Sequence, residues 1–234
     1  MTESILYIAT IAAVVLSLFA QIYVSSTFKR FSRKATLRGE SAESVARYVL
    51  DEAGCYDVCI ERVGGSLTDH YDPRTKTLRL SDSVYGNASA AAIGVACHEA
   101  GHAIQHRANY FPVKVRSALV PVTTFASRTW TWVLIAGVAL MYLLPMGGTV
   151  GYLLMFVGLG ALAVSTAFQL VTLPCELDAS KRALRAMRKT GYFASRELGS
   201  AKKVLTAAAL TYIAAALVSV LQLLRLISIL GRRR

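Results

Sequence analysis

A five-residue run, His98-Glu99-Ala100-Gly101-His102, combines side chains that are suited to metal-assisted hydrolysis. Residues four apart on an α-helix lie about 40° apart in projection, so both imidazoles face one side and can bind a single ion. Glu99 lies about 100° round from His98, where it can reach a water on the ion without becoming a ligand. The pattern predicts a zinc site with His98 and His102 as ligands and Glu99 as the catalytic base of a peptide-bond hydrolase.

Chance is the first alternative, because roughly one protein in a hundred contains this pattern by accident. The motif lies in a run of small and apolar residues, including Ala96 and Ala103, that predicts a helix and so favours a zinc site. The second alternative is a structural zinc site in a non-catalytic membrane protein. Such a site normally has four protein ligands and no use for a glutamate beside its first histidine, so Glu99 favours catalysis.

A catalytic zinc needs a third protein ligand and an open position for water. The candidates are His70, His106, Glu176 and Asp178. His106 lies a further turn along the motif's helix, and His70 lies in a predicted hairpin where it could contact substrate. Glu176 is preferred, because it follows Pro174 at the membrane end of an apolar run and starts a predicted helix over residues 176–189. The alternative for Glu176 is an ordinary carboxylate at a helix N-terminus.

Short elements with turn residues between them indicate a soluble or membrane-surface unit over residues 28–117. Ser41 is the expected N-cap of a helix that Gly54 ends. Asn87 is the expected cap of the motif's helix, over residues 88 to about 108. Strand-like runs are expected over residues 57–63, 66–70 and 77–80.

The run Tyr71-Asp72-Pro73-Arg74 predicts a turn before the strand at residues 77–80, which leads towards the motif's helix. We expect the edge of this strand to bind an extended substrate by strand addition. The alternative is a strand that is paired only within the protein.

Four long apolar runs account for a hydrophobic content of 54% and a mean hydropathy of +0.45. They cover residues 5–26, 129–144, 149–173 and 204–230. The first is an expected uncleaved anchor rather than a signal peptide, because the N-terminus carries Glu3 in place of basic residues. The middle two predict a membrane hairpin. The last could span or, because it contains Arg225, lie tilted or against the soluble unit.

The fold class expected from these elements is mainly α, a multi-pass helical membrane protein with a small α+β metallopeptidase unit made of a short β-hairpin and the motif's helix. Five segments are predicted: a transmembrane anchor (1–27), the metallopeptidase unit (28–117), a transmembrane hairpin (118–173), a helix with the third zinc ligand (174–203), and an apolar helix with a basic tail (204–234).

The formal net charge of +12 comes mainly from basic runs that flank the apolar segments. One such run, residues 29–38, follows the first apolar segment, and another, residues 181–189, follows the third. The positive-inside rule places both runs and the active site on the cytoplasmic side of the membrane. The arginines at 232–234 disagree if the last run spans. No base-reading module is present, so membrane lipids rather than nucleic acid are the expected partner.

The four cysteines, Cys55, Cys59, Cys97 and Cys175, lack the spacing of a disulfide framework or of a CxxC metal site. Pairing or metal binding by Cys55 and Cys59 is the alternative to the preferred interpretation, in which they are small apolar fillers. Cys97 and Cys175 adjoin suspected ligands, but no cysteine is assigned to the metal site.

Several segments resemble the YugP-like family of predicted neutral zinc metallopeptidases of bacterial membranes, and the likeness covers nearly the whole chain. They are LTDHYDP (67–73), TLRLS (77–81), VY (84–85), AAIGVACHE (91–99), LPCELDASKRA (173–183) and AAALTY (207–212). The resemblance implies His98, His102 and Glu176 as ligands of one zinc ion per chain, with Glu99 as the base. The expected activity is an endopeptidase that cuts membrane-associated or unfolded polypeptides near the bilayer surface.

More distantly, the layout is similar to the HtpX and CAAX prenyl protease gluzincins, in which an aspartate stands four residues after the ligand glutamate. This chain has Ser180 at that place and Asp178 two residues after Glu176, so either could orient a ligand histidine. We expect Asp178, Ser180, His70 and His106 to orient ligands or to contact substrate. AAA-type membrane proteases also contain HEAGH, but this sequence has no GxxxxGK[ST] loop, so ATP is not expected as a partner.

Overall fold

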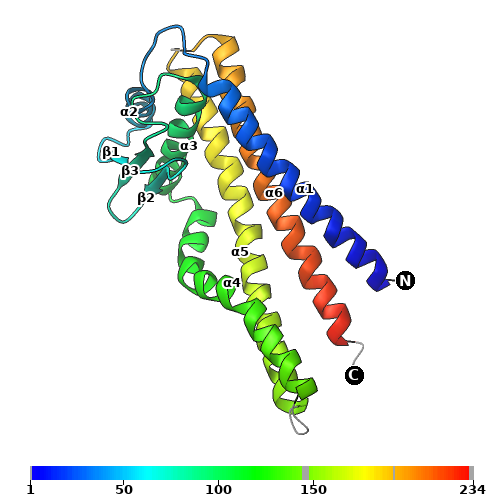
Figure 1. Cartoon of the computed structure of the whole chain (residues 1–234). Helices are drawn as coiled ribbons and strands as arrows, with labels where there is room; N and C mark the ends of the chain where they lie inside the picture. Colours follow the sequence, from blue (N-terminus) through cyan, green and yellow to red (C-terminus); the bar gives the residue numbers. More distant parts are fainter. Residues whose placement is uncertain (1, 144–147, 192, 232–234) are drawn as a thin grey trace. The chain divides into compact units, whose positions relative to one another are not determined.

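The computed structural model describes residues 2–143, 148–191 and 193–231, and it is mainly helical with one small sheet (Figure 1). Along these residues the elements are α1 (Thr2–Ser32), α2 (Ala42–Glu52), β1 (Cys59–Val63), β2 (His70–Asp72), β3 (Thr77–Ser81), α3 (Ala90–Arg107), α4 (Phe111–Leu143), α5 (Gly148–Lys189) and α6 (Ser195–Gly231).

The chain divides into two compact units. The helical unit contains Met1–Leu18, Lys114–Leu173 and Tyr212–Arg234. The motif unit contains Phe19–Val113 and Pro174–Thr211. It therefore holds the sheet, α2 and α3, together with the C-terminal part of α5 and the N-terminal part of α6, which are distant from them in sequence.

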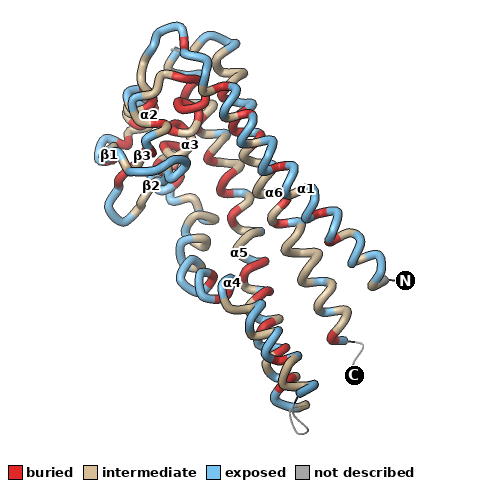
Figure 2. Tube along the Cα trace, in the orientation of Figure 1, coloured by how far each residue is buried: buried red, intermediate tan, exposed pale blue. Residues whose placement is uncertain are grey.

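Helix α2 contributes an apolar face to the core of the motif unit. Val45, Val49 and Leu50 are buried and belong to the same cluster as residues of α3, and Figure 2 shows long buried stretches in α3. Gly54 follows the helix with φ +73°, a backbone conformation that glycine adopts without steric cost. The predicted helix and its stop at Gly54 are therefore confirmed, but Ser41 at the N-cap position bonds through its hydroxyl to Ser44 rather than to a backbone N–H.

The sheet has the strand order β1-β3-β2, with β3 parallel to β1 and antiparallel to β2. The hairpin consists of β2 and β3, and the strand predicted over residues 66–70 is wrong because β2 begins only at His70. The central strand β3 buries Leu78 and Leu80 completely. The expectation that its edge binds substrate is also wrong, since β3 is paired on both sides and the edge strands are β1 and β2.

The N-terminus of α3 is capped by Ser89, whose side-chain oxygen accepts a hydrogen bond from the N–H of Ala92. The predicted cap, Asn87, lies two residues too early, because its side chain instead accepts from the N–H of Ser89. Ser and Asn are about equally good caps, so composition alone does not choose between them. The helix nevertheless carries the whole motif from His98 to His102.

Helices α4 and α5 are longer than predicted, because Pro121 and Pro174 lie inside them. A proline removes one backbone hydrogen bond, and a long helix tolerates that loss because its other backbone hydrogen bonds remain. The prediction that Glu176 starts a helix is therefore wrong: Glu176 lies within α5, and a helix N-terminus cannot explain its carboxylate.

Among the described residues three helices are long and apolar enough to cross a membrane: Glu3–Ser32, Gly148–Lys189 and Ser195–Gly231. The predicted span over residues 129–144 is helical up to Leu143 but is not one of the three. Pro145 and Gly147 of the predicted hairpin loop, and the arginines at 232–234, lie outside the described residues.

Small residues allow helices of the helical unit to approach closely. A Cβ placed on Gly137 of α4 would lie 2.8 Å from the carbonyl oxygen of Gly151 in α5. The hydroxyls of Thr166 in α5 and Ser219 in α6 lie 2.8 Å apart. Small residues and hydroxyl hydrogen bonds at helix contacts are typical of packing within a bilayer.

In the motif unit, Gly101 of α3 packs directly on the backbone of α5. A Cβ placed on Gly101 would lie 2.5 Å from the carbonyl oxygen of Ala179, closer than real contacts allow. A Cβ on Gly94, about two helical turns earlier, would lie 3.5 Å from Ala201 in α6, which is ordinary contact.

We predict that Gly101→Ala destabilises the protein by about 1–3 kcal/mol, because the backbone of α5 must move to admit the methyl group. Gly94→Ala is the matched control, and it should leave stability unchanged or raise it slightly, since alanine favours the helix. Thermal unfolding of both variants, followed by circular dichroism in detergent with a chelator, measures the difference. Equal midpoints for the two variants would contradict the close contact.

Candidate metal centre

Three side chains converge in the motif unit: His98 and His102 of α3 and Glu176 of α5, whose ligand atoms all lie within 4.8 Å of one another. The Oε2 atom of Glu176 is 3.0 Å from His98 Nε2 and 3.6 Å from His102 Nε2. Ligand atoms around a tetrahedral zinc lie about 3.4 Å apart, as bond lengths of about 2.1 Å require. The donor set therefore fits zinc in both chemistry and spacing.

The two imidazoles lie one helical turn apart, with ring centroids separated by 4.9 Å and planes inclined at 82°. Between the helices the contact surface consists of small residues, because Ala100, Ala103 and Ala179 are buried around Gly101. This surface brings α5 close enough for a short carboxylate side chain to reach both rings.

Gln105 fixes the tautomer of His102. Its Nε2 atom donates to the carbonyl oxygen of Cys175 at 2.7 Å and to the carboxylate of Asp178 at 2.9 Å, and both of these groups can only accept. The Oε1 atom of Gln105 therefore faces His102 Nδ1, 2.9 Å away, and accepts a hydrogen bond from its N–H. Because Nδ1 carries this proton, Nε2 of His102 points to Glu176 and is the atom that would bind an ion.

Asp178 is in turn held by Arg182, one turn along α5, whose Nε lies 2.5 Å from the carboxylate. The hydrogen bonds and charge of Arg182, together with Gln105, outweigh the effect of burial and lower the pKa of Asp178. Asp178 is thus an anionic acceptor that acts on His102 through Gln105 rather than directly.

Ser180 occupies the corresponding place for the other histidine, because its hydroxyl lies 3.1 Å from His98 Nδ1. A hydroxyl can accept a hydrogen bond from Nδ1–H, so that Nε2 of His98 faces Glu176, as Nε2 of His102 does. The question left open by the sequence has a divided answer: Ser180 contacts His98, and Asp178 reaches His102 through a third residue.

Glu176 is only 2% exposed. Burial opposes its ionisation, but hydrogen bonds and charge from His102 and His98 outweigh burial and hold the pKa of the carboxyl well below its ordinary value. A buried carboxylate needs a positive partner, and a divalent cation between these three groups satisfies that need.

Glu99 faces the sheet rather than the three-residue cluster. Its Oε2 atom accepts a hydrogen bond of 3.1 Å from the backbone N–H of Tyr71, on the edge strand β2. The bond fixes the Glu99 carboxylate next to β2, and Glu99 is not one of the three residues that could hold an ion.

The structure places His70 and His106 outside the cluster of possible ligands. His70 is exposed on β2, and its Nδ1 donates to the carbonyl oxygen of Thr68. His106 bonds through Nδ1 to the hydroxyl of Tyr71 at 2.9 Å. Burial, with smaller contributions from Cys55 and nearby aspartates, raises the pKa of Tyr71 to about 12, so its phenol stays protonated at neutral pH.

All four cysteines are free thiols. Cys55, Cys97 and Cys175 are buried, as fillers should be, whereas Cys59 is exposed on β1 and the filler interpretation is wrong for it. Complete burial raises the pKa of Cys97 to about 12, so its thiol remains protonated and is a poor metal ligand beside His98.

Two groups of the site were not singled out from the sequence. Gln105 is seven residues after His98 and three after His102, so helical spacing places it on the histidine face, and this signal could have identified it. The N–H of Tyr71 gave no such signal, because a backbone donor is available at almost any residue.

A comparison with curated proteins finds a relative that is 45% identical over 222 residues, which cover 94% of this chain and 94% of that protein. It is described as "Putative membrane protease YugP" from Bacillus subtilis (strain 168). No solved structure matches the chain.

A family model described as "Putative neutral zinc metallopeptidase" matches residues 6–231. The match takes in both the His-Glu-x-x-His helix and the part of α5 that carries Glu176. Because it extends over nearly the whole sequence, and the relative agrees with it, the chain belongs to this zinc metallopeptidase family.

Proposed function

We propose that the protein is a membrane-embedded zinc endopeptidase in which His98, His102 and Glu176 bind one zinc ion and Glu99 is the catalytic base. The observation that carries the proposal is the convergence of a buried carboxylate from α5 with two Nε2 atoms from α3. The family's description and the name of the relative as a membrane protease support it.

Zinc bound there would polarise the substrate carbonyl and lower the pKa of a water molecule. Glu99 accepts the proton of that water on a carboxylate oxygen and returns it to the leaving amide nitrogen. The N–H of Tyr71 keeps the carboxylate oriented for both transfers. Gln105 and Ser180 hold the two imidazoles with their Nε2 atoms toward Glu176, so that the rings need not rotate before they bind zinc.

The free edge of β2 is the proposed docking place for an extended polypeptide. This strand is paired only with β3 on one side, and its Tyr71 N–H bonds to Glu99 on the other. A substrate strand added along β2 would bring its backbone to the catalytic carboxylate. His70, exposed on the same strand, would contact that substrate.

The proposed setting is a bacterial inner membrane that the chain crosses several times, with the active site on the cytoplasmic side. Three long apolar helices support a membrane protein, and the basic runs after residues 28 and 180 support this orientation through the positive-inside rule. The segments at 1–27, 118–173 and 204–234 are then membrane parts, and those at 28–117 and 174–203 form the peptidase. Membrane-associated or unfolded polypeptides are the proposed substrates.

We predict that Glu99→Gln abolishes cleavage of an unfolded test protein while zinc content stays at one ion per chain. The amide cannot accept the proton from water, but it leaves the three ligands in place. Glu61→Gln removes an exposed carboxylate on β1 and is the matched control, which should retain full activity. Zinc is measured by mass spectrometry of the metal, and undiminished cleavage by the Glu99 variant would exclude its catalytic role.

We predict that His98→Ala and Glu176→Ala each lose most of the bound zinc, because two ligands do not hold the ion against a chelator. His106→Ala changes a histidine of the same helix outside the cluster and should retain zinc. Metal analysis after dialysis against a weak chelator measures the difference. Normal zinc content in the Glu176 variant would show that Glu176 is not a zinc ligand.

We predict that Gln105→Leu weakens zinc binding by about 10- to 100-fold, because His102 then lacks the acceptor that holds its proton on Nδ1. Competition with a zinc chelator of known affinity measures the change. The metal-free variant should still unfold cooperatively, which separates positioning of the imidazole from loss of the fold. An unchanged zinc affinity would show that Gln105 does not position His102.

A further inference from the structure

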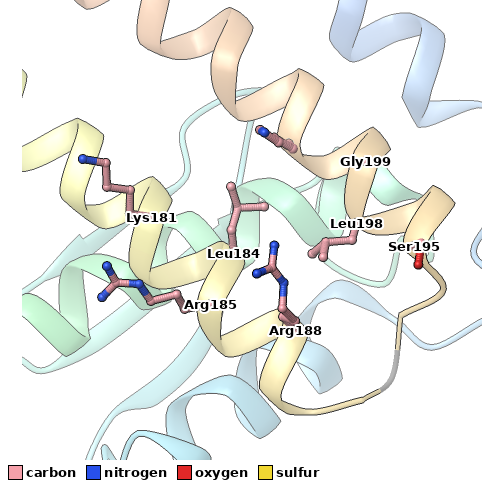
Figure 3. A pocket seen from close by; sticks show the side chains of 8 residues that line it. Lys181, Leu184, Arg185, Arg188, Ser195, Leu198 and Gly199 are labelled. Atoms are coloured by element: carbon pink, nitrogen blue, oxygen red, sulfur yellow. The ribbon is translucent and has the colours of Figure 1, made fainter.

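A cavity of about 520 Å³ lies in the motif unit between the last turns of α5 and the first turns of α6 (Figure 3). Leu184 and Leu198 provide its apolar surface. Around them stand four cationic side chains, with no carboxylate among the described lining residues. These four, called the basic cavity residues below, are Lys181, Arg185, Arg188 and Lys202.

The spacing of these cations gives them a shared face. Lys181, Arg185 and Arg188 follow one another at intervals of four and three residues on α5, so they lie along one side of the helix. Lys202 approaches from α6, whose first residue, Ser195, also lines the cavity. Figure 3 shows the Arg188 side chain extending between Leu184 and Leu198.

Neighbouring cations of α5 have acidic partners, unlike these four. Arg182 pairs with Asp178 at 2.5 Å, and Lys189 pairs with Glu52. Within the described part of the chain, none of the basic cavity residues takes part in an ion pair. Arg185 does lie near Asp178, but the same carboxylate oxygen already accepts from Arg182 and Gln105.

The helix dipole does not account for this arrangement. Cations in the last turn of a helix offset its negative end, and this explains Arg188. Lys181 and Arg185 lie further back on α5, and Lys202 belongs to a different helix. Four like charges around one cavity repel one another, and a bound anion relieves that repulsion.

We propose that the basic cavity binds the phosphate group of an anionic ligand. Guanidinium groups match phosphate oxygens in pairs of hydrogen bonds, and ammonium groups add point charge. The volume suits a headgroup or a small phosphate ester. Because Lys202 stands only two residues before the apolar run at 204–230, about 3 Å along the helix, an anionic phospholipid can supply this phosphate as well as a free solute can.

The test is calorimetric titration of the full-length protein in an uncharged detergent with four probes: dihexanoyl phosphatidylglycerol, dihexanoyl phosphatidylcholine, inorganic phosphate and a hexaglutamate peptide. The cavity variant carries Lys181→Gln, Arg185→Gln and Lys202→Gln. The control variant carries Arg74→Gln, Arg196→Gln and Lys203→Gln, which removes the same charge from exposed positions outside the lining.

We expect the parent and the control variant to bind phosphatidylglycerol alike. The cavity variant should bind it about a hundredfold more weakly, at roughly fivefold per cation. Inorganic phosphate that binds as tightly as phosphatidylglycerol identifies a free phosphate compound as the ligand, and much weaker phosphate binding identifies the lipid. Equal binding of phosphatidylcholine, equal loss in the control variant, or binding of a hexaglutamate peptide alone would each overturn the proposal.

Zinc content provides the check that the cavity variant is folded, because none of its three positions belongs to the metal cluster. If that variant loses zinc, Lys202→Glu alone replaces it. Reversal of this single charge should weaken phosphatidylglycerol binding by more than the fivefold expected for its neutralisation, and unchanged binding would overturn the proposal.

Discussion

The contact between Gly101 of α3 and the backbone of Ala179 in α5 is the constraint on which the metal centre depends. With no side chain at position 101, the two helices approach until a Cβ there would lie 2.5 Å from a carbonyl oxygen. That approach brings the Glu176 carboxylate to 3.0 Å from one imidazole and 3.6 Å from the other. The distances between the Glu176 carboxylate and the two imidazoles therefore depend on how the buried small residues of α3 and α5 pack.

Hydrogen bonds orient the two imidazoles that helix packing brings close to Glu176. The two imidazoles are held through their Nδ1 atoms by different means, a hydroxyl from Ser180 and an amide from Gln105. The amide is oriented by acceptors of α5, so α5 supplies Glu176, the hydroxyl that contacts His98 and the groups that orient Gln105. The Glu99 carboxylate bonds to the backbone of β2. In the proposed mechanism, metal binding and proton transfer therefore depend on different elements of one unit.

Residue types and spacing predict the motif's helix and the meeting of His98, His102 and Glu176, because helical geometry and the resemblance to a family leave little freedom there. The sequence does not predict the strand order. Strands β1 and β3 pair across a crossover, and the residues of such short strands do not specify which strand lies beside them. The sequence also predicts a helix end in the wrong place. Proline usually ends a helix, but α5 continues through Pro174. The helical spacing that identifies the two histidines also includes Gln105. A neutral amide does not indicate a role at a metal site, however, until its hydrogen-bond partners are known.

The ligand carboxylate stands 78 positions after the first imidazole. During synthesis the ribosome therefore releases α3 well before α5, and a nascent chain that ends short of residue 176 has only two of the three side chains of the cluster. The group that could hold an ion is complete only after α5 has been synthesised and has packed against Gly101 of α3.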